Sequence, residues 1–126
     1  MSRTTLPEKR LHPDIRKFVA ENHRDVVDEV EAAVAGHKVV VVGMAQNPHV
    51  RKARKLLDRA GAPYHYLEYG SYMNQWRRRN ALKMWAGWPT FPMVFVNGQL
   101  IGGAADLSRM IKSGAFEALL AEPYGV

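Results

Sequence analysis

Residues 44–50, MAQNPHV, are the first place in this chain where the order of elements favours chemistry. They follow the β-branched run of residues 39–42 and precede a stretch with helical spacing, so we expect a turn between a buried strand and a helix start. A helix start presents free N–H groups and a partial positive charge, which favour bound anions. This turn nevertheless contains no thiol, no carboxylate and no glycine-rich phosphate loop. The residues instead predict helix capping, with Asn47 as the N-cap and Pro48 as the first helical residue.

His49 is the one titratable side chain in this turn. An acid–base role would call for a nucleophile or an orienting carboxylate beside it in the sequence, and neither is present. We therefore expect an exposed residue on the lip of the turn, with acid–base catalysis as the alternative. The spacing of the other histidines does not match a metal site, so no metal is expected. Those histidines are His12, His23, His37 and His65.

The elements that position this turn are predicted to form a βαβ unit. Apolar residues recur at helical spacing from Val50 to Leu57, and Gly61 is a suitable helix end. Residues 63–69 alternate as in a second strand, which would run parallel to the first through the intervening helix. The turn at Asn47 would then lie at the carboxyl end of the first strand.

The remaining pattern adds a hairpin and further helices. Residues 93–103, MVFVNGQLIGG, predict two short strands joined by Asn97-Gly98, which is a strong hairpin signal. Further helices are predicted at residues 13–35 (in two pieces broken near 22–23), 72–85, 105–112 and 115–121. The resulting order is ααβαβαββαα, which indicates a small α/β fold with a mixed sheet.

Composition limits the classes of protein to which the chain can belong. The 126 residues suit one domain, and we predict a tail at residues 1–12 and a single domain at residues 13–126. No apolar run reaches the roughly 20 residues of a membrane span. The first residues include basic side chains without an apolar segment behind them, so a secretory signal is not expected. A cytoplasmic location is the default expectation.

The chain is basic, with a net charge of +6, and much of the excess lies in two clusters within residues 51–55 and 77–79. Such an excess can indicate polyanion binding. No aromatic platform is interleaved with the first cluster, however, and no nucleic-acid-binding motif is present. Solvated helix faces are therefore the favoured interpretation, and a nucleic-acid partner is not expected. Cysteine is absent, which excludes disulfides, thiolate metal sites and cysteine nucleophiles within this chain.

Two segments together resemble the glutaredoxin family, especially its single-cysteine class. Residues 87–107, GWPTFPMVFVNGQLIGGAADL, match the W-P-T-[IF]-P segment, the hairpin and the G-G-x-x-D sequence of that class. Residues 39–57, VVVVGMAQNPHVRKARKLL, align without a gap on its first strand, active-site turn and helix. The resemblance covers about residues 26–120. It implies the thioredoxin fold: a central four-stranded mixed sheet flanked by helices, here with extra N-terminal helices.

The resemblance also shows what the turn has lost. On the two-cysteine pattern C-P-Y-C, Asn47 stands where the nucleophilic cysteine would be and Val50 where the resolving one would be, with Pro48 and His49 between them. Disulfide exchange proceeds by thiolate attack, which an amide side chain cannot perform. Nor can this chain ligate an iron–sulfur cluster through its own cysteine. The resemblance thus implies a turn of retained shape without its reaction.

The resemblance further places a glutathione site on this chain. Thr90, Phe91 and Pro92 fall where relatives pair a backbone edge with the peptide, ahead of a cis proline. Gly103 and Ala104 fall at a helix start that holds the γ-glutamyl end through backbone amides. The alternative for the proline turn is a purely structural role.

Two further positions in the resemblance are charged. Asp106 matches the last aspartate of G-G-x-x-D and would accept from the ligand ammonium or cap the helix. Arg79 falls where relatives carry an arginine that contacts the glycine carboxylate, and the alternative is a solvated member of the arginine run. Two departures weaken the site, because Met44 replaces a usual lysine and Ala105 replaces the aspartate of G-G-C-D. Losing such a charged contact costs about 1.5–3 kcal/mol.

Three functions compete on this reading. The leading one is a non-catalytic module, related to redox homeostasis, that binds glutathione, a glutathionylated peptide or a protein partner. The second is a transferase-like enzyme that uses the thiolate of bound glutathione. The third is a scaffold for protein interaction, carried by aromatic residues expected at the surface: Tyr69, Tyr72, Trp76 and Trp85. Core packing is the alternative role for the side chains of the helix predicted at residues 72–85. Its inward residues would be Met73, Trp76, Leu82 and Trp85. Partner and oligomeric state are not readable from the sequence.

Overall fold

The computed structural model describes residues 3–123, so residues 1–2 and 124–126 of the predicted tail and domain lie outside the described part. The order of helices and strands is the predicted one, with a short 3-10 turn, η1 (Glu8–Arg10), added before the first helix. The helices are α1 (Pro13–Glu21), α2 (Arg24–Gly36), α3 (Pro48–Arg59), α4 (Trp76–Ala86), α5 (Ala104–Ser113) and α6 (Ala115–Ala121). The strands are β1 (Val39–Gly43), β2 (His65–Glu68), β3 (Met93–Val96) and β4 (Gln99–Gly102).

The four strands form one mixed sheet in the order β2-β1-β3-β4. β1 runs parallel to β2, with Val40 opposite His65, and antiparallel to β3, with Val40 opposite Phe95. Every residue of β1 is buried, as its β-branched run predicts for a central strand. β3 and β4 are joined by Asn97 and Gly98, which both have positive φ angles (51° and 84°). That is the backbone of a type I′ hairpin turn, which the Asn-Gly pair favours.

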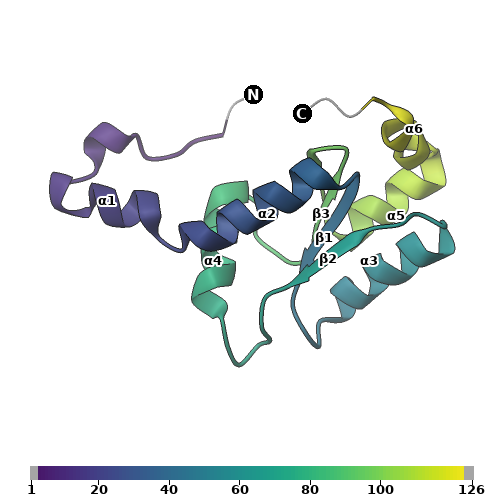
Figure 1. The fold of residues 1–126 in the computed structure, drawn as a ribbon, viewed down its shortest axis with the longest axis horizontal. Coiled ribbons are helices and arrows are strands. Elements are labelled where there is room, and N and C mark those ends of the chain that lie inside the picture. The colour runs from purple at the N-terminus through teal and green to yellow at the C-terminus, as the bar shows by residue number, and fades with distance from the viewer. Residues whose placement is uncertain (1–2, 124–126) are drawn as a thin grey trace.

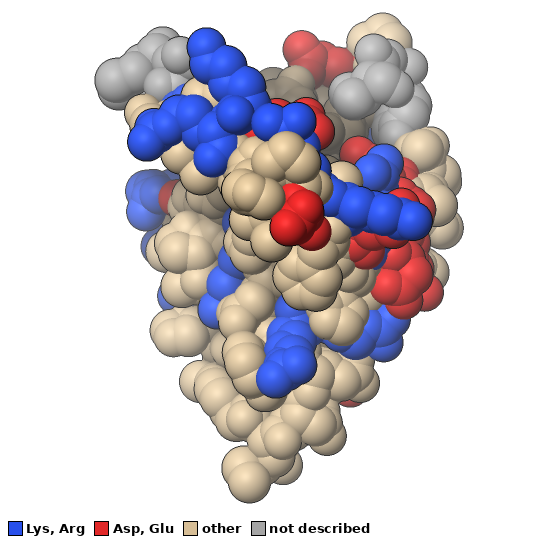
Figure 2. Space-filling model, turned by 90° about the vertical axis from the view of Figure 1, so that its left-hand side faces the viewer, with Lys and Arg blue, Asp and Glu red and all other residues tan. Residues whose placement is uncertain are grey.

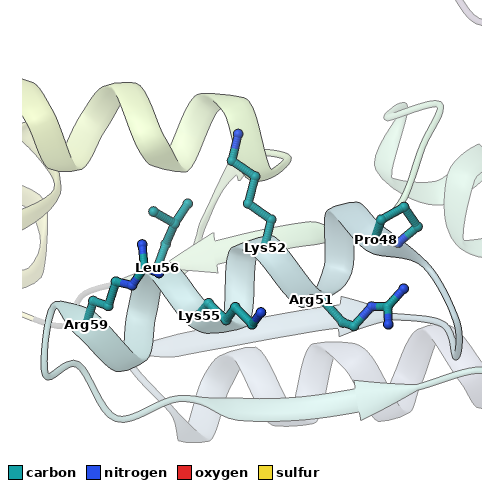
Figure 3. Close-up of a pocket in the computed structure, with 6 residues that line it drawn as sticks. All are labelled: Pro48, Arg51, Lys52, Lys55, Leu56 and Arg59. Atoms are coloured by element: carbon teal, nitrogen blue, oxygen red, sulfur yellow. The ribbon is translucent and has the colours of Figure 1, made fainter.

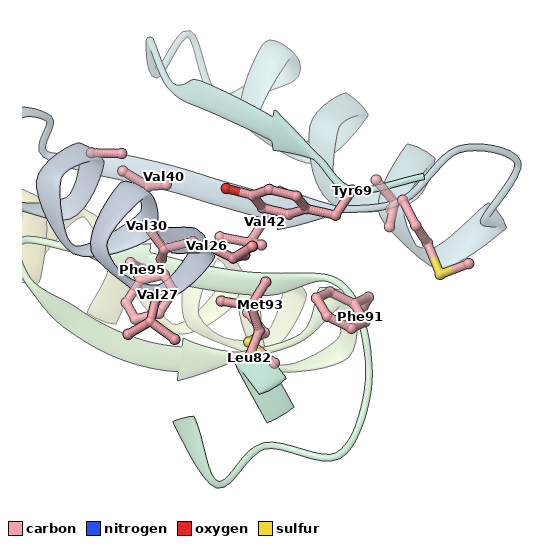
Figure 4. Packing of buried hydrophobic residues seen from close by; sticks show 13 residues of the cluster. Val26, Val27, Val30, Val40, Val42, Tyr69, Leu82, Phe91, Met93 and Phe95 are labelled. Carbon is pink, nitrogen blue, oxygen red and sulfur yellow. The ribbon is translucent and has the colours of Figure 1, made fainter. Parts of the chain in front are cut away.

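Helices cover both faces of the sheet (Figure 1). On one face, α2 and α4 pack over alternate residues of β1 and β3, and Figure 4 shows this cluster around Val40, Val42, Met93 and Phe95. On the other face, α3, α5 and α6 cover the residues in between, with Phe116 of α6 among the buried side chains. The alternation of strand side chains between two covered faces explains why the central strands β1 and β3 are apolar throughout. α3 therefore follows β1 at one end of a sheet that is packed on both faces.

The break between the first two helices lies where it was predicted. His23, between α1 and α2, has a left-handed backbone with φ of 49°. The prediction for α4 was wrong in part: Met73 precedes the helix and is 89% exposed, and Trp76, its first residue, is 54% exposed. Leu82 of α4 is fully buried, and Trp85 packs against the core as predicted.

Of the four aromatic residues expected at the surface, Tyr72 and Trp76 are exposed and Trp85 is half-buried. Tyr69 is buried, which corrects that expectation. Its hydroxyl donates to Glu29 of α2, and Arg78 of α4 pairs with Asp25 at 3.0 Å. These contacts tie the loop after β2 and the start of α4 to α2.

The segment before α2 extends from the sheet and its helices (Figure 1). No residue of α1 is buried. The predicted tail is not wholly loose, because the Arg3 guanidinium donates to the backbone carbonyl of Ala86 at 2.9 Å. Among residues 3–123, the helices are all too short or too polar to cross a membrane.

Candidate functional site

The turn between β1 and α3 is closed by the side chain of Asn47. Its Oδ1 accepts hydrogen bonds from the backbone N–H groups of His49 at 2.9 Å and Val50 at 3.2 Å. Pro48 occupies the first helical turn, so both predictions for this helix start are confirmed. Asn47 is only 7% exposed. The amides that a helix start would offer to an anion are therefore already occupied by a neutral side chain.

Close packing of α3 on β1 fixes this turn. Gly43, the last residue of β1, has no side chain, and a Cβ there would lie 2.7 Å from Cγ1 of Val50. Val50 is buried beneath the first turn of α3. A larger residue at Gly43 would push the helix start away from the strand, because real Cβ contacts are never that short. The absence of a side chain at Gly43 thus lets the helix start sit directly over the end of the strand.

The second part of the site is the loop that enters β3. The peptide bond between Phe91 and Pro92 is cis, as expected from the resemblance. Both residues are buried, whereas Thr90 before them is exposed. Trp88 stands at the start of the same loop, and its indole Nε1 is buried without a hydrogen-bond partner among the described residues. A buried donor without a partner is costly, and because this atom is shielded from solvent it does not itself face a bound molecule.

The third part is the start of α5. The backbone N–H of Gly103 donates to Oδ2 of Asp106 at 2.9 Å, and Oδ1 of Asp106 pairs with Arg109. Gly102 has a φ of 115°, and a Cβ there would collide with the Asp106 carboxylate. Both carboxylate oxygens of Asp106 are therefore engaged within the protein. Of the two roles considered for Asp106, the geometry shows helix capping directly.

These three parts enclose one pocket of about 220 Å³. Its lining residues are His49, Trp88, Thr90, Phe91, Pro92, Gly103, Ala104, Ala105 and Asp106. The structure thus brings together seven of the residues predicted from the sequence, from segments more than 50 positions apart. The predicted site omitted Trp88 and Ala105, although both lie inside the segments that carry the resemblance. Asn47, Pro48 and Val50 lie at the turn without lining the pocket.

Arg79 is the predicted site residue that the structure sets apart from this pocket. It is 7% exposed, and one terminal nitrogen, Nη1, donates to the backbone carbonyls of Tyr69 at 2.9 Å and Asn74 at 2.6 Å. Burial lowers the pKa of its guanidinium. Arg79 therefore holds the loop between β2 and α4 in place. Its burial contradicts the alternative of a solvated residue, whereas contact with a ligand carboxylate stays a prediction.

The electrostatics of the pocket are weak. Met44, where relatives have a lysine, is buried and adds no charge. His49 is exposed at the mouth, as predicted, and has no hydrogen-bonded side-chain partner among the described residues. Within residues 3–123, no three histidine, aspartate or glutamate side chains are grouped so that they could hold a metal. The site can offer backbone amides, the wall of the Trp88 ring and a cis-proline edge, which suit a small peptide rather than a strongly charged anion.

Comparisons with known proteins agree on one family. The Glutaredoxin family model matches residues 39–101. A protein described as glutaredoxin-like from Dictyostelium discoideum is 48% identical over 101 residues, which cover 80% of this chain and 82% of that protein. The structural match to wheat glutaredoxin covers 82% of this chain and 94% of that one, with a TM-score of 0.68 and 31% identity. A buckwheat glutaredoxin–glutathione complex gives a TM-score of 0.70 at 25% identity and covers 79% of this chain and 91% of that one. The four-stranded sheet is therefore that of the thioredoxin fold, as predicted.

Proposed function

Because this chain belongs to the glutaredoxin family and contains no cysteine, we propose that it is a non-catalytic binding module of that family. Its ligand is glutathione, a glutathionylated peptide or the segment of a protein partner, bound in the pocket beside cis-Pro92. We place it in redox homeostasis without thiol–disulfide exchange of its own. The cytoplasm, expected from the sequence, is the compartment that we propose.

The observation that carries this proposal is the contrast between the pocket and the turn beside it. The pocket is built from the backbone of the cis-proline loop and the start of α5, and neither depends on a thiol. At the start of α3, Asn47 uses its oxygen to cap two amides. A glutaredoxin stabilises its thiolate with such amides, so here the chemical step has been replaced by a structural contact.

Support for a peptide-like ligand comes from the pocket walls. In the loop before β3, Thr90 is exposed and lines the pocket, so its backbone can pair with an extended ligand. Backbone pairing supplies affinity for a peptide without charged contacts. The related buckwheat protein has been solved as a complex with glutathione. Since Met44 and the buried Arg79 supply no charge to the pocket, we expect weaker binding than a site with both cations would give.

A titration of reduced glutathione followed by backbone amide shifts tests this proposal. We expect saturable shifts at Thr90, Gly103 and Ala104 below about 5 mM ligand, with little change at the buried Arg79. Ala105→Phe should abolish them, because Ala105 is exposed and lines the pocket. Ala32→Phe, at an exposed site on α2, is the matched control. Absence of any shift in the wild type would remove glutathione and leave only a protein ligand.

The control for residual chemistry is a mixed-disulfide reduction assay. We expect the purified chain to reduce a glutathione mixed disulfide no faster than buffer, because no side chain can form the required thiolate. Activity near that of a cysteine-containing family member, with contaminants excluded, would contradict the non-catalytic role while leaving the binding pocket intact.

A further inference from the structure

A second hollow lies on the outer side of α3, apart from the cis-proline pocket. Its volume is about 410 Å³, and its lining residues are Pro48, Arg51, Lys52, Lys55, Leu56 and Arg59. Figure 3 shows that all six project from α3, with Lys52 extending toward the neighbouring helix. Four of the six are cations and none is acidic. From the sequence, we interpreted these charges as a solvated helix face. In the structure they line one groove.

The four cations are not neutralised within the protein. Among residues 3–123, the ion pairs use other basic residues, and no carboxylate pairs with the side chains of the four groove cations there. Arg54 on the same helix differs, because its Nε donates to the Tyr64 hydroxyl at 3.2 Å and its guanidinium lies 4.0 Å from the Tyr66 ring centroid. α3 therefore separates one cation that serves the fold from four that serve no contact in it.

This arrangement is electrostatically unfavourable for the free protein. Arg51, Lys55 and Arg59 follow each other at intervals of four residues, which places them in one row about 6 Å apart. Like charges at that spacing on a helix destabilise it. The face seen in Figure 2 is different, since acidic and basic side chains are mixed there and its narrow lower end is uncharged. A bound acidic group would relieve the repulsion along α3.

The groove also has an apolar floor. Leu56 is half-buried and packs against the core cluster beneath α3, and Pro48 closes one end of the groove. The aliphatic stems of lysine and arginine extend this surface. Among the residues that the structure describes, no aromatic side chain lines the groove, so these offer no platform on which nucleic-acid bases would stack. Carboxylates interleaved with an apolar residue match the lining better than a chain of phosphates does.

We propose that this α3 groove docks an acidic, amphipathic segment of a partner protein, with carboxylates against Arg51, Lys55 and Arg59 and an apolar side chain on Leu56. The groove begins at Pro48, and the next residue, His49, lines the cis-proline pocket. A partner held along α3 would therefore reach the mouth of that pocket. The docking surface does not depend on glutathione binding and stands on the charges and shape of α3 alone.

The test measures fluorescence anisotropy with a labelled peptide of about 16 residues, carrying glutamates four residues apart and a leucine on the same helical face. We expect a dissociation constant below about 1 mM at low salt. Binding should weaken as salt rises, because screening acts over about 8 Å at physiological ionic strength. The triple variant R51Q/K55Q/R59Q should bind roughly tenfold more weakly, as expected for three exposed ion pairs.

The matched control is K9Q/R10Q/K17Q, which removes three exposed cations from the N-terminal segment and changes the net charge equally. We expect it to bind the peptide as the wild type does, within about twofold. Glutamine keeps the helix propensity of α3, and a thermal melt of each variant checks its fold.

Three results would overturn the proposal. One is the absence of saturable peptide binding by the wild type. Another is an equal loss in both triple variants, which would assign the effect to net charge. The last is tighter binding, through Arg51, Lys55 and Arg59, of a single-stranded oligothymidylate that carries the same charge as the peptide.

Discussion

Replacing Arg79 by methionine tests whether this residue supports the fold or contacts the ligand. Methionine keeps much of the apolar stem but removes the guanidinium, whose Nη1 donates to the carbonyls of Tyr69 and Asn74. A hydrogen bond from a charged donor is worth about 1.5–3 kcal/mol. The bond to Tyr69 is buried and carries most of this value, whereas the bond to Asn74 is partly accessible to water.

The cost of burying the guanidinium opposes these two bonds. Burial lowers the pKa of Arg79, so the charged form is disfavoured by its surroundings and its removal returns some free energy. We therefore expect R79M to lower the free energy of unfolding by about 2 kcal/mol. With an unfolding entropy of about 2.1 cal/mol/K per residue, a chain of this length should melt about 8 °C lower.

Thermal unfolding followed by circular dichroism measures this change, and glutathione titration of the same variant measures binding. Arg77→Met is the control, because Arg77 is an exposed neighbour whose guanidinium lies 5.1 Å from the ring centroid of Trp76. Its stability should change by less than about 0.5 kcal/mol. A melting temperature of R79M within about 1 °C of the wild type, together with lost glutathione binding, would refute the structural role and assign Arg79 to the ligand.

Three other predictions concern the turn, the loop after β2 and the start of α5. Asn47→Cys should create a thiol with a pKa below its usual value, because the amides capped by Asn47 would face the thiolate; thiol titration and mixed-disulfide reduction measure the gain. Burial, and then the hydrogen bond to Glu29, raises the pKa of Tyr69 above its usual value of 10.0. The neutral form is favoured in the folded state, so its stabilisation is complete below pH 10 and is lost as the pH rises further. Tyr69→Phe should flatten this alkaline loss in urea titrations run across pH 8–12, and an unchanged slope would count against it. Gly102→Ala should lower stability by more than about 1 kcal/mol, because φ is 115° and the Asp106 carboxylate fills the space; a melting temperature like that of the wild type would contradict this.

Local features of the fold were predictable from the sequence because their causes lie within a few residues. The Asn47 cap bonds residues two and three positions ahead, and the Asn97-Gly98 turn depends on its own φ angles. The order of strands and helices follows from apolar periodicity in the same way. The glutaredoxin resemblance added the cis bond before Pro92, which no local pattern would have indicated.

The exposed position of Met73 was missed because helical spacing does not say where a helix begins. The turn before α4 runs through Gln75, whose φ is 57°, and α4 starts only at Trp76. Met73 consequently lies outside the helix. Tyr69 was misplaced for a related reason, since its burial depends on α2 covering the end of β2.

The sequence alone determined what chemistry this protein lacks, because the absence of cysteine holds whatever the fold. It also determined the capped turn at Asn47, whose bonds are local. Only the tertiary structure decided that Arg79 turns inward to backbone carbonyls, since its buried partner Tyr69 lies ten residues earlier along the chain. Likewise, only folding joined the cis-proline loop to the start of α5 in one pocket, because sheet pairing and helix packing set those distances rather than spacing along the chain.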